Sequence, residues 1–362
     1  MRHYPYVGPS PLAALTLAIL ALGLAGCSGN AAAAANSWPG LSADGQFVYV
    51  AFNQAVHALD PSSGTERWRF PAEAERNVAF FAAPTPTEDG HVIVGSYDKK
   101  VYSLNSSDGS VTWTFEGASN RIVGPAAVAG DLVLVPSSEG VLYALRLASG
   151  VQVWSFRAAE ALWAEPLADG GRVFIASLDH HIYALDAETG AEIWRQDLEA
   201  AVAGGPVLAD GHLLVGTLGR GLQALDPATG DVIWTFATEG WVWGIPTIYQ
   251  GMALFGDVNG TVYAVDVSQG SQVWRIQLDG AITASPAVEG DVVYLPTEAG
   301  TVYARRAGSG DPEWQIPLGG KLLSDPILTG DKLLVASLGG GSLVTCLDPQ
   351  SGATRWSFQP TQ

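Results

Sequence analysis

A twelve-residue unit that carries a glycine and a tryptophan occurs eight times along this chain. Its clearest copy is YALDAETGAEIW at 183–194, and every copy keeps three residues between the glycine and the tryptophan. A period of about 40 residues is typical of propellers and solenoids, in which each repeat buries its apolar surface against the next. The tryptophans stand 40 to 45 residues apart, at Trp68, Trp113, Trp154, Trp194, Trp234, Trp274, Trp314 and Trp356.

Each repeat contains the pattern of four short strands. Within 166–196 the stretches RVFIAS, IYALDA and AEIWRQ are separated by LDHH and ETG, and a shorter strand comes first. Turn residues at these separations are typical of antiparallel hairpins. The second strands, such as VIVGS and LVLVPS, are almost continuously apolar, which indicates burial on both faces. We therefore predict an all-β fold, an eight-bladed β-propeller of four-stranded antiparallel blades over residues 40–358.

The unit YALD-x-x-TG-x-x-x-W resembles the PQQ-like repeat. The WD40 repeat has a similar period, but its Gly-His and Trp-Asp dipeptides do not recur in each unit here. PQQ-like repeats are shared by eight-bladed quinoprotein dehydrogenases and by the non-enzymatic BamB-type lipoprotein of the outer-membrane β-barrel assembly machine. The resemblance covers residues 40–358 and implies the fold. It does not specify an activity, because propellers of one fold host many activities.

Two positions inside the repeat have an expected structural role. An aspartate follows the Ala-Leu pair in several copies, for example Asp60, Asp186 and Asp348, where its side chain can cap the turn. The glycine is present in every copy, as expected if its φ is positive. The first unit begins at Gly40 in phase with the others, so we expect no exchange of strands between the first and last blades.

The N-terminal segment predicts a lipid-anchored protein outside the cytoplasm. Residues 11–26 are apolar and uncharged but too short to span a bilayer, which needs about 20 residues. They end in LAGC, which resembles the lipobox of bacterial lipoproteins. This resemblance implies a signal peptide over 1–26, a lipid anchor on Cys27 and a tether over 27–39. In a cell with two membranes, Ser28 would favour the outer membrane, with the protein facing the periplasm; otherwise it would lie on the outer face of the cell membrane.

Charge and cysteine content narrow the possible partners. The formal net charge of −18 argues against nucleic acid and against docking of a basic patch on anionic lipid. With Cys27 lipidated, the second cysteine, Cys346, has no partner for an intramolecular disulfide. Its apolar surroundings in SLVTCLDP predict a buried thiol.

Catalytic and metal-binding patterns are weak in this sequence. By resemblance, the quinoprotein dehydrogenases need a calcium ion held by Glu, Asn and Asp, an aspartate base and usually a vicinal disulfide. The chain has neither a Cys-Cys pair nor a long insertion to carry such groups, so we expect no cofactor and no enzymatic activity. The stretch LDHH (Asp179, His180, His181) occupies a hairpin turn. Because adjacent residues on a strand point to opposite faces, we expect no metal site there.

The segments that link one blade to the next vary most between copies. In a propeller such a link crosses one face toward the central axis. Three positions before the proline that recurs in each link the sequence has Phe81, Ile122, Trp163, Ala203, Trp243, Thr283 and Leu323. Phe80, Arg121, Glu165, Trp241 and Asp325 lie close to the aromatic members of this set.

Two interpretations of these link residues remain open. They either pack between blades and cover the core, or form an aromatic surface that binds a protein partner, since Trp, Tyr, Phe and Arg anchor many interfaces. The repeat and the lipobox together predict a monomeric, non-enzymatic envelope scaffold, similar to the BamB type, that binds proteins in outer-membrane β-barrel assembly. An envelope propeller with another binding or sensing role, or a PQQ-dependent dehydrogenase, are the alternatives.

Overall fold

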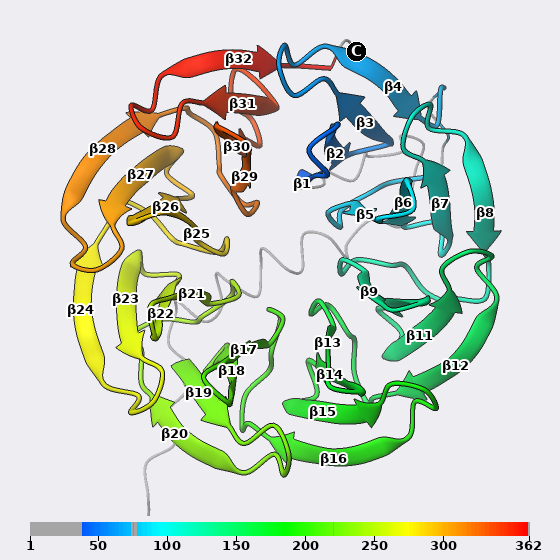
Figure 1. The fold of residues 1–362 in the computed structure, drawn as a ribbon, viewed down its shortest axis with the longest axis horizontal. Coiled ribbons are helices and arrows are strands. Elements are labelled where there is room, and N and C mark those ends of the chain that lie inside the picture. Colours follow the sequence, from blue (N-terminus) through cyan, green and yellow to red (C-terminus); the bar gives the residue numbers. More distant parts are fainter. Residues whose placement is uncertain (1–37, 74, 76–77, 220, 361–362) are drawn as a thin grey trace, which may run out of the picture. The chain divides into compact units, whose positions relative to one another are not determined.

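Eight four-stranded antiparallel sheets surround a common axis in the computed structural model, which describes residues 38–73, 75, 78–219 and 221–360 (Figure 1). The first strand of each sheet lies nearest the axis and the fourth forms the rim. The predicted all-β, eight-bladed propeller is confirmed. Cys27 and the predicted signal peptide lie outside the described residues, so their roles stay predictions.

The strands follow one another in chain order within every blade. Blades 1 to 4 contain β1 (Gly40–Ala43), β2 (Val48–Phe52), β3 (Ala55–Leu59), β4 (Glu66–Phe70); β5 (Thr85–Pro86), β6 (His91–Gly95), β7 (Val101–Asn105), β8 (Val111–Phe115); β9 (Ala127–Ala129), β10 (Leu132–Pro136), β11 (Val141–Arg146), β12 (Gln152–Arg157); β13 (Leu167–Asp169), β14 (Arg172–Ala176), β15 (His181–Asp186) and β16 (Glu192–Asp197). Blades 5 to 8 contain β17 (Val207–Ala209), β18 (His212–Thr217), β19 (Gly221–Leu225), β20 (Val232–Phe236); β21 (Thr247–Tyr249), β22 (Met252–Gly256), β23 (Thr261–Asp266), β24 (Gln272–Gln277); β25 (Ala287–Glu289), β26 (Val292–Pro296), β27 (Thr301–Arg306), β28 (Pro312–Pro317); β29 (Ile327–Thr329), β30 (Lys332–Ala336), β31 (Val344–Leu347) and β32 (Thr354–Phe358).

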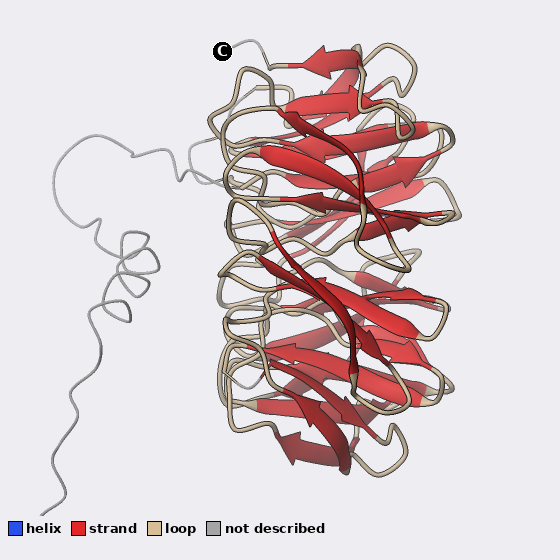
Figure 2. Ribbon diagram, turned by 90° about the vertical axis from the view of Figure 1, so that its left-hand side faces the viewer, coloured by secondary structure: helices blue, strands red, loops and turns tan. Residues whose placement is uncertain are grey.

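The hydrophobic core lies between neighbouring blades. The second strand of each blade is buried on both faces, as its continuous apolar sequence predicted; in β14, for example, Val173 to Ala176 are all buried. The strands run between two faces that carry the loops (Figure 2). Within the described ranges, the molecule has no helix long and apolar enough to cross a membrane.

The repeated tryptophan joins its own blade to the next one. Trp154 at the rim of blade 3 donates an Nε1 hydrogen bond to the carbonyl oxygen of Ala187 in blade 4, at 3.0 Å. Its ring lies against Gly190 of the same turn, where a Cβ would stand 2.5 Å from the indole. The same indole-to-carbonyl bond occurs at all eight tryptophans, with acceptors Ser106, Leu147, Ala187, Pro227, Val267, Ala307, Pro349 and Pro61.

The repeated aspartate caps the turn between the third and fourth strands, as expected. Asp186 Oδ1 accepts hydrogen bonds from the backbone N–H groups of Glu188 (3.2 Å) and Thr189 (2.9 Å). Asp348 does the same for Gln350 (3.1 Å) and Ser351 (2.9 Å). The side chain satisfies backbone donors that the turn leaves without a strand partner.

Side chains, and not a shared strand, close the ring between blades 8 and 1. Each sheet contains strands of its own blade only, so the first and last blades do not exchange strands. Trp356 donates to the carbonyl oxygen of Pro61 at 3.0 Å, and the Ser324 hydroxyl donates to the carbonyl oxygen of Pro39. Residues of β2 and β30 also share one apolar cluster, which includes Val50 and Leu334.

Cys346 in β31 and Arg305 in β27 replace residues that are common at the same positions of the third strand in other blades. Cys346 is fully buried in β31, as predicted, and burial raises the pKa of its thiol to about 11. A thiol with a raised pKa is a poor nucleophile at neutral pH. Arg305 stands where the other blades have a buried leucine or valine, and it lies over the ring of Tyr303 at 5.1 Å.

Candidate functional site

The links between blades and the hairpins between second and third strands lie on one face, here called the link face. This follows from strand direction, because the fourth strand of one blade ends on the same side as its second strand. Backbone hydrogen bonds join the two sets of loops: Leu162 N–H donates to Ser137 at 3.2 Å, and Leu178 N–H donates to Ala161 at 3.1 Å. The candidate link residues therefore all belong to segments of the link face.

Phe80 and Phe81 are buried, which for these two residues favours the interpretation that link residues cover the core. Phe80 is fully buried and donates its backbone N–H to Asn53 at 2.8 Å. Phe81 is 5% exposed and stacks on Tyr97, with ring centroids 4.1 Å apart. Phe80 forms isolated β-bridges with Asn53, which follows β2, and with Ser96, which follows β6, so it lies between blades 1 and 2 beneath the link face.

The alignment of the links by their prolines is wrong in one copy. Ile122 N–H donates to Ser96, which is the bond that Leu162 makes to Ser137 in the next link. Ile122 is therefore the counterpart of Leu162, and both side chains are buried. Val123, and not Ile122, occupies the position of Trp163.

Aromatic rings and a guanidinium form a continuous row across blades 1 to 3. The ring of Trp38 meets Phe81 edge-on at a centroid distance of 5.4 Å, and Phe81 stacks on Tyr97. The guanidinium carbon of Arg121 lies 4.9 Å from the centroid of Tyr97. Burial raises the pKa of the Tyr97 phenol, and the positive charge of Arg121 acts on it in the opposite direction.

Ser138 connects this row to Trp163 in the link to blade 4. Its backbone N–H donates to the carbonyl oxygen of Arg121 at 3.0 Å, and its hydroxyl accepts from Trp163 Nε1 at 3.3 Å. We call the set Trp38, Phe81, Tyr97, Arg121, Ser138 and Trp163 the aromatic strip. Sequence reasoning missed Trp38 and Tyr97, because neither stands at the aligned link position.

Trp241 and Trp243 lie on the link to blade 6, away from the aromatic strip in the ring of blades (Figure 1). Both are half-buried. The carbonyl oxygen of Trp241 accepts from the N–H of Val258 at 3.0 Å, which fixes the link to its own hairpin. Among the described residues, no hydrogen bond or ring contact joins these tryptophans to the aromatic strip.

Glu165 and Asp325 approach the axis from blades 4 and 8, which face each other across the ring (Figure 1). Burial, together with the charge of Asp325, raises the pKa of Glu165 to about 7. Asp325 accepts from the N–H of Ser285 at 2.6 Å. Asp325 keeps exposed surface, but protein atoms around its carboxyl group reduce the hydration of that group, and this raises its pKa as well.

The LDHH stretch is a hairpin turn, as expected. The carboxylate of Asp179 accepts from the Tyr183 hydroxyl at 2.7 Å and from the backbone N–H groups of Ala159 (2.9 Å) and His181 (3.0 Å). The acid is thus occupied by the turn. Within the part of the chain that the structure describes, no group of three or more His, Cys, Asp and Glu is placed to hold a metal ion.

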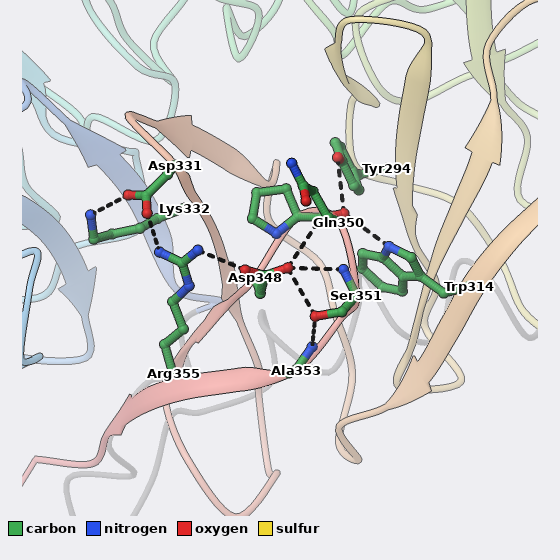
Figure 3. Close-up of polar contacts among 10 residues, drawn as sticks. Tyr294, Trp314, Asp331, Lys332, Asp348, Gln350, Ser351, Ala353 and Arg355 are labelled. Atoms are coloured by element: carbon green, nitrogen blue, oxygen red, sulfur yellow. Dashed lines mark hydrogen bonds and ion pairs between the residues drawn. The ribbon is translucent and has the colours of Figure 1, made fainter.

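The opposite face carries a groove of about 610 Å³ between blades 7 and 8 that the sequence did not indicate (Figure 3). Arg355 bridges Asp331 at 2.6 Å and Asp348 at 2.7 Å, and Lys332 pairs with Asp331 at 2.7 Å. The groove acids Asp331 and Asp348 are therefore both paired with basic side chains. An equivalent groove of about 370 Å³ lies between blades 2 and 3. Grooves of this kind therefore arise from the repeated packing of blades and do not mark a single dedicated site.

The fold and its repeats define the class: an eight-bladed β-propeller of PQQ-like repeats. A family model described as outer membrane protein assembly factor BamB matches residues 29–124, 116–191, 178–279 and 258–362. Because these matches cover most of the chain, the protein belongs to the BamB family.

Solved structures show the same fold at low sequence identity. The crystal structure of BamB from Moraxella catarrhalis is 20% identical, with a TM-score of 0.71, over 84% of this chain and 92% of that one. The computationally designed Ika8 protein is 15% identical, with a TM-score of 0.71, over 86% of this chain and 96% of that one. A comparison with curated proteins finds no match. Since a designed protein fits as well as BamB, structural similarity here concerns the fold alone.

Proposed function

We propose that this protein is a non-enzymatic scaffold of the cell envelope that binds a protein partner during assembly of outer-membrane β-barrel proteins. The observation that carries the proposal is the BamB family match, which extends from residue 29 to residue 362. The lipobox-like LAGC supports a lipid anchor on Cys27, and in a cell with two membranes Ser28 supports a place at the outer membrane facing the periplasm. No cofactor is part of the proposal.

The link face supports a partner-binding role through its half-buried tryptophans. Trp163 donates an Nε1 hydrogen bond to Ser138, and both Trp163 and Trp243 are half-buried, so part of each residue stays accessible. Large rings held in place lose little conformational entropy on binding, which is why tryptophan is enriched at the energetic centres of interfaces. Arg121 adds a charged group to the same face.

Co-purification tests the proposed partner. The full chain, tagged at its C-terminus, is extracted in mild detergent from membranes of its own source and its partners are identified by mass spectrometry. We expect a membrane β-barrel assembly protein in near-stoichiometric amount. Its absence, with the tagged protein intact, would contradict the proposal. Cys27→Ser, which removes the predicted lipid site, should release the chain from the membrane fraction.

Truncation of the link-face tryptophans should weaken that capture. We expect Trp163→Ala or Trp243→Ala to reduce the captured partner while the free energy of unfolding changes by about 1 kcal/mol or less, as for many surface substitutions. Ile233→Ala is the matched control, because Ile233 is 49% exposed on the rim. Strong destabilisation of both tryptophan variants would instead assign these rings to the core.

A further inference from the structure

Arg121 has no acidic partner among the described residues. The structure gives it a ring contact with Tyr97, and no carboxylate lies within ion-pair distance in the described part of the chain. The chain has 36 acidic and 18 Lys and Arg residues, and nearby arginines are paired: Arg146 with Asp131 and Arg157 with Glu139. In so acidic a molecule, a guanidinium without a carboxylate is available to an acid from outside.

The surroundings hold Arg121 in a fixed position. Its ring partner Tyr97 stacks on the buried Phe81, and its carbonyl oxygen accepts from Ser138 at 3.0 Å. A guanidinium carries five N–H donors in one plane, so contact with a ring leaves donors free for a carboxylate. A preorganised guanidinium of this kind favours bidentate recognition of a carboxylate.

Apolar surface lies on both sides of the cation. Trp38 is 40% exposed at one end of the aromatic strip, and the half-buried Trp163 lies at the other. The order along the link face is therefore indole, guanidinium, indole. A ligand that matches this order has an acidic group between two apolar groups. Repulsion from the other acids of the protein is screened beyond about 8 Å at physiological salt.

We propose that the aromatic strip binds an extended segment of a partner protein in which an aspartate or glutamate is flanked by apolar side chains. The carboxylate accepts hydrogen bonds from Arg121, and the apolar side chains pack on Trp38 and Trp163. This inference rests on the proposed partner-binding role of the link face and adds the chemistry of the bound segment.

Selection of peptides on the full chain tests the inference without the natural partner. Random twelve-residue peptides displayed on phage are selected on the detergent-purified protein, and the peptide bound most tightly is then synthesised. We expect an Asp or Glu next to Leu, Ile, Phe or Trp. Replacing that acid by its amide in the peptide should weaken binding about tenfold, the range of one charge-assisted bidentate contact.

The matching protein variants use the same peptide. Arg121→Gln should lose about the same tenfold, and Arg121→Lys should lose less because it keeps the charge but not the paired geometry. Arg195→Gln is the control, since Arg195 is 61% exposed on the rim of blade 4 and should bind the peptide as the unmodified chain does. The peptide amide gives an answer that does not depend on folding of any variant.

Selected peptides without an acid, no selected peptide, or equal binding by the Arg121→Gln variant would each overturn the inference. The outcome is separate from that of the co-purification. Acidic peptides that depend on Arg121, with no barrel protein recovered, would leave this inference standing and contradict the proposed function. Recovery of a barrel protein without such peptides would support the proposed function and contradict this inference.

Discussion

Two independent constraints act on the glycine of each repeat. The sequence alone accounts for one of them, the positive φ, which is +71° at Gly190. The second comes from the preceding blade, because the indole of Trp154 occupies the space that a Cβ would need. The glycine and the tryptophan that stand four residues apart in the sequence therefore act in different interfaces: each glycine receives the tryptophan of the blade before it.

Gly190→Ala should destabilise the protein more than Gly171→Ala. Both glycines have similar positive φ angles, +71° and +78°, so both alanines meet about 1 kcal/mol of backbone strain. Only at Gly190 does a Cβ fall 2.5 Å from an indole atom, since Gly171 has no atom within 4 Å. We expect a loss of about 2–4 kcal/mol at Gly190, measured by denaturant unfolding. Equal losses would show that strain alone explains the glycine.

Neighbouring blades are joined mainly by side chains. Each rim strand ends one sheet, and its tryptophan reaches across to a turn of the next sheet. The bond from Trp356 to Pro61 repeats this contact between the last blade and the first. Ring closure therefore uses the same device as every other blade interface, and no part of the ring depends on a shared strand.

Trp356→Ala should open the ring at one interface. We expect a loss of about 3–5 kcal/mol, typical of a buried tryptophan, because Trp356 is 9% exposed. Hydrogen exchange of backbone amides should rise first in blades 1 and 8. Trp234→Ala serves as the comparison, with faster exchange in blades 5 and 6 instead. A uniform increase over all blades in both variants would argue against separable interfaces.

At the scale of the whole molecule, the ring brings together groups that no single blade contains. Glu165 and Asp325 stand far apart in the sequence and belong to opposite blades. Their repulsion, added to burial, raises the pKa of Glu165 to about 7. An acid with a raised pKa binds protons more readily in the folded state than in the unfolded chain, where its pKa is about 4.3. Its contribution to stability is therefore lost as the pH rises from about 4.3 to about 7.

Glu165→Gln should remove this pH dependence. At pH 8 the variant should be more stable than the unmodified protein by roughly 1 kcal/mol, a value reduced for solvent screening because Glu165 is only half-buried. The advantage should shrink as the pH falls, because the native glutamate then becomes protonated. Thermal unfolding between pH 5 and pH 8 measures the difference. Glu160→Gln, in the same link but exposed, is the control. Parallel curves for Glu165→Gln and the unmodified protein would contradict the prediction.

The link face also shows where sequence reasoning reached its limit. Trp163 and Trp243 interrupt the repeat, and the structure leaves both half-buried on the link face. Phe80 and Phe81 interrupt it in the same way but fill the core. One-residue differences in link length, as at Ile122, change which residue reaches the surface, and spacing from a proline does not reveal them.

The sequence by itself determined the number of blades, their strands and the turn chemistry, because each depends on local patterns repeated eight times. Only the tertiary structure decided which side chains meet. Trp38 precedes the first strand, whereas Tyr97, Arg121 and Trp163 come from a hairpin and two links; the opposed pair Glu165 and Asp325 comes from blades half a ring apart. Contacts of this kind depend on how the links fold over the blades and on closure of the ring, which no single repeat encodes.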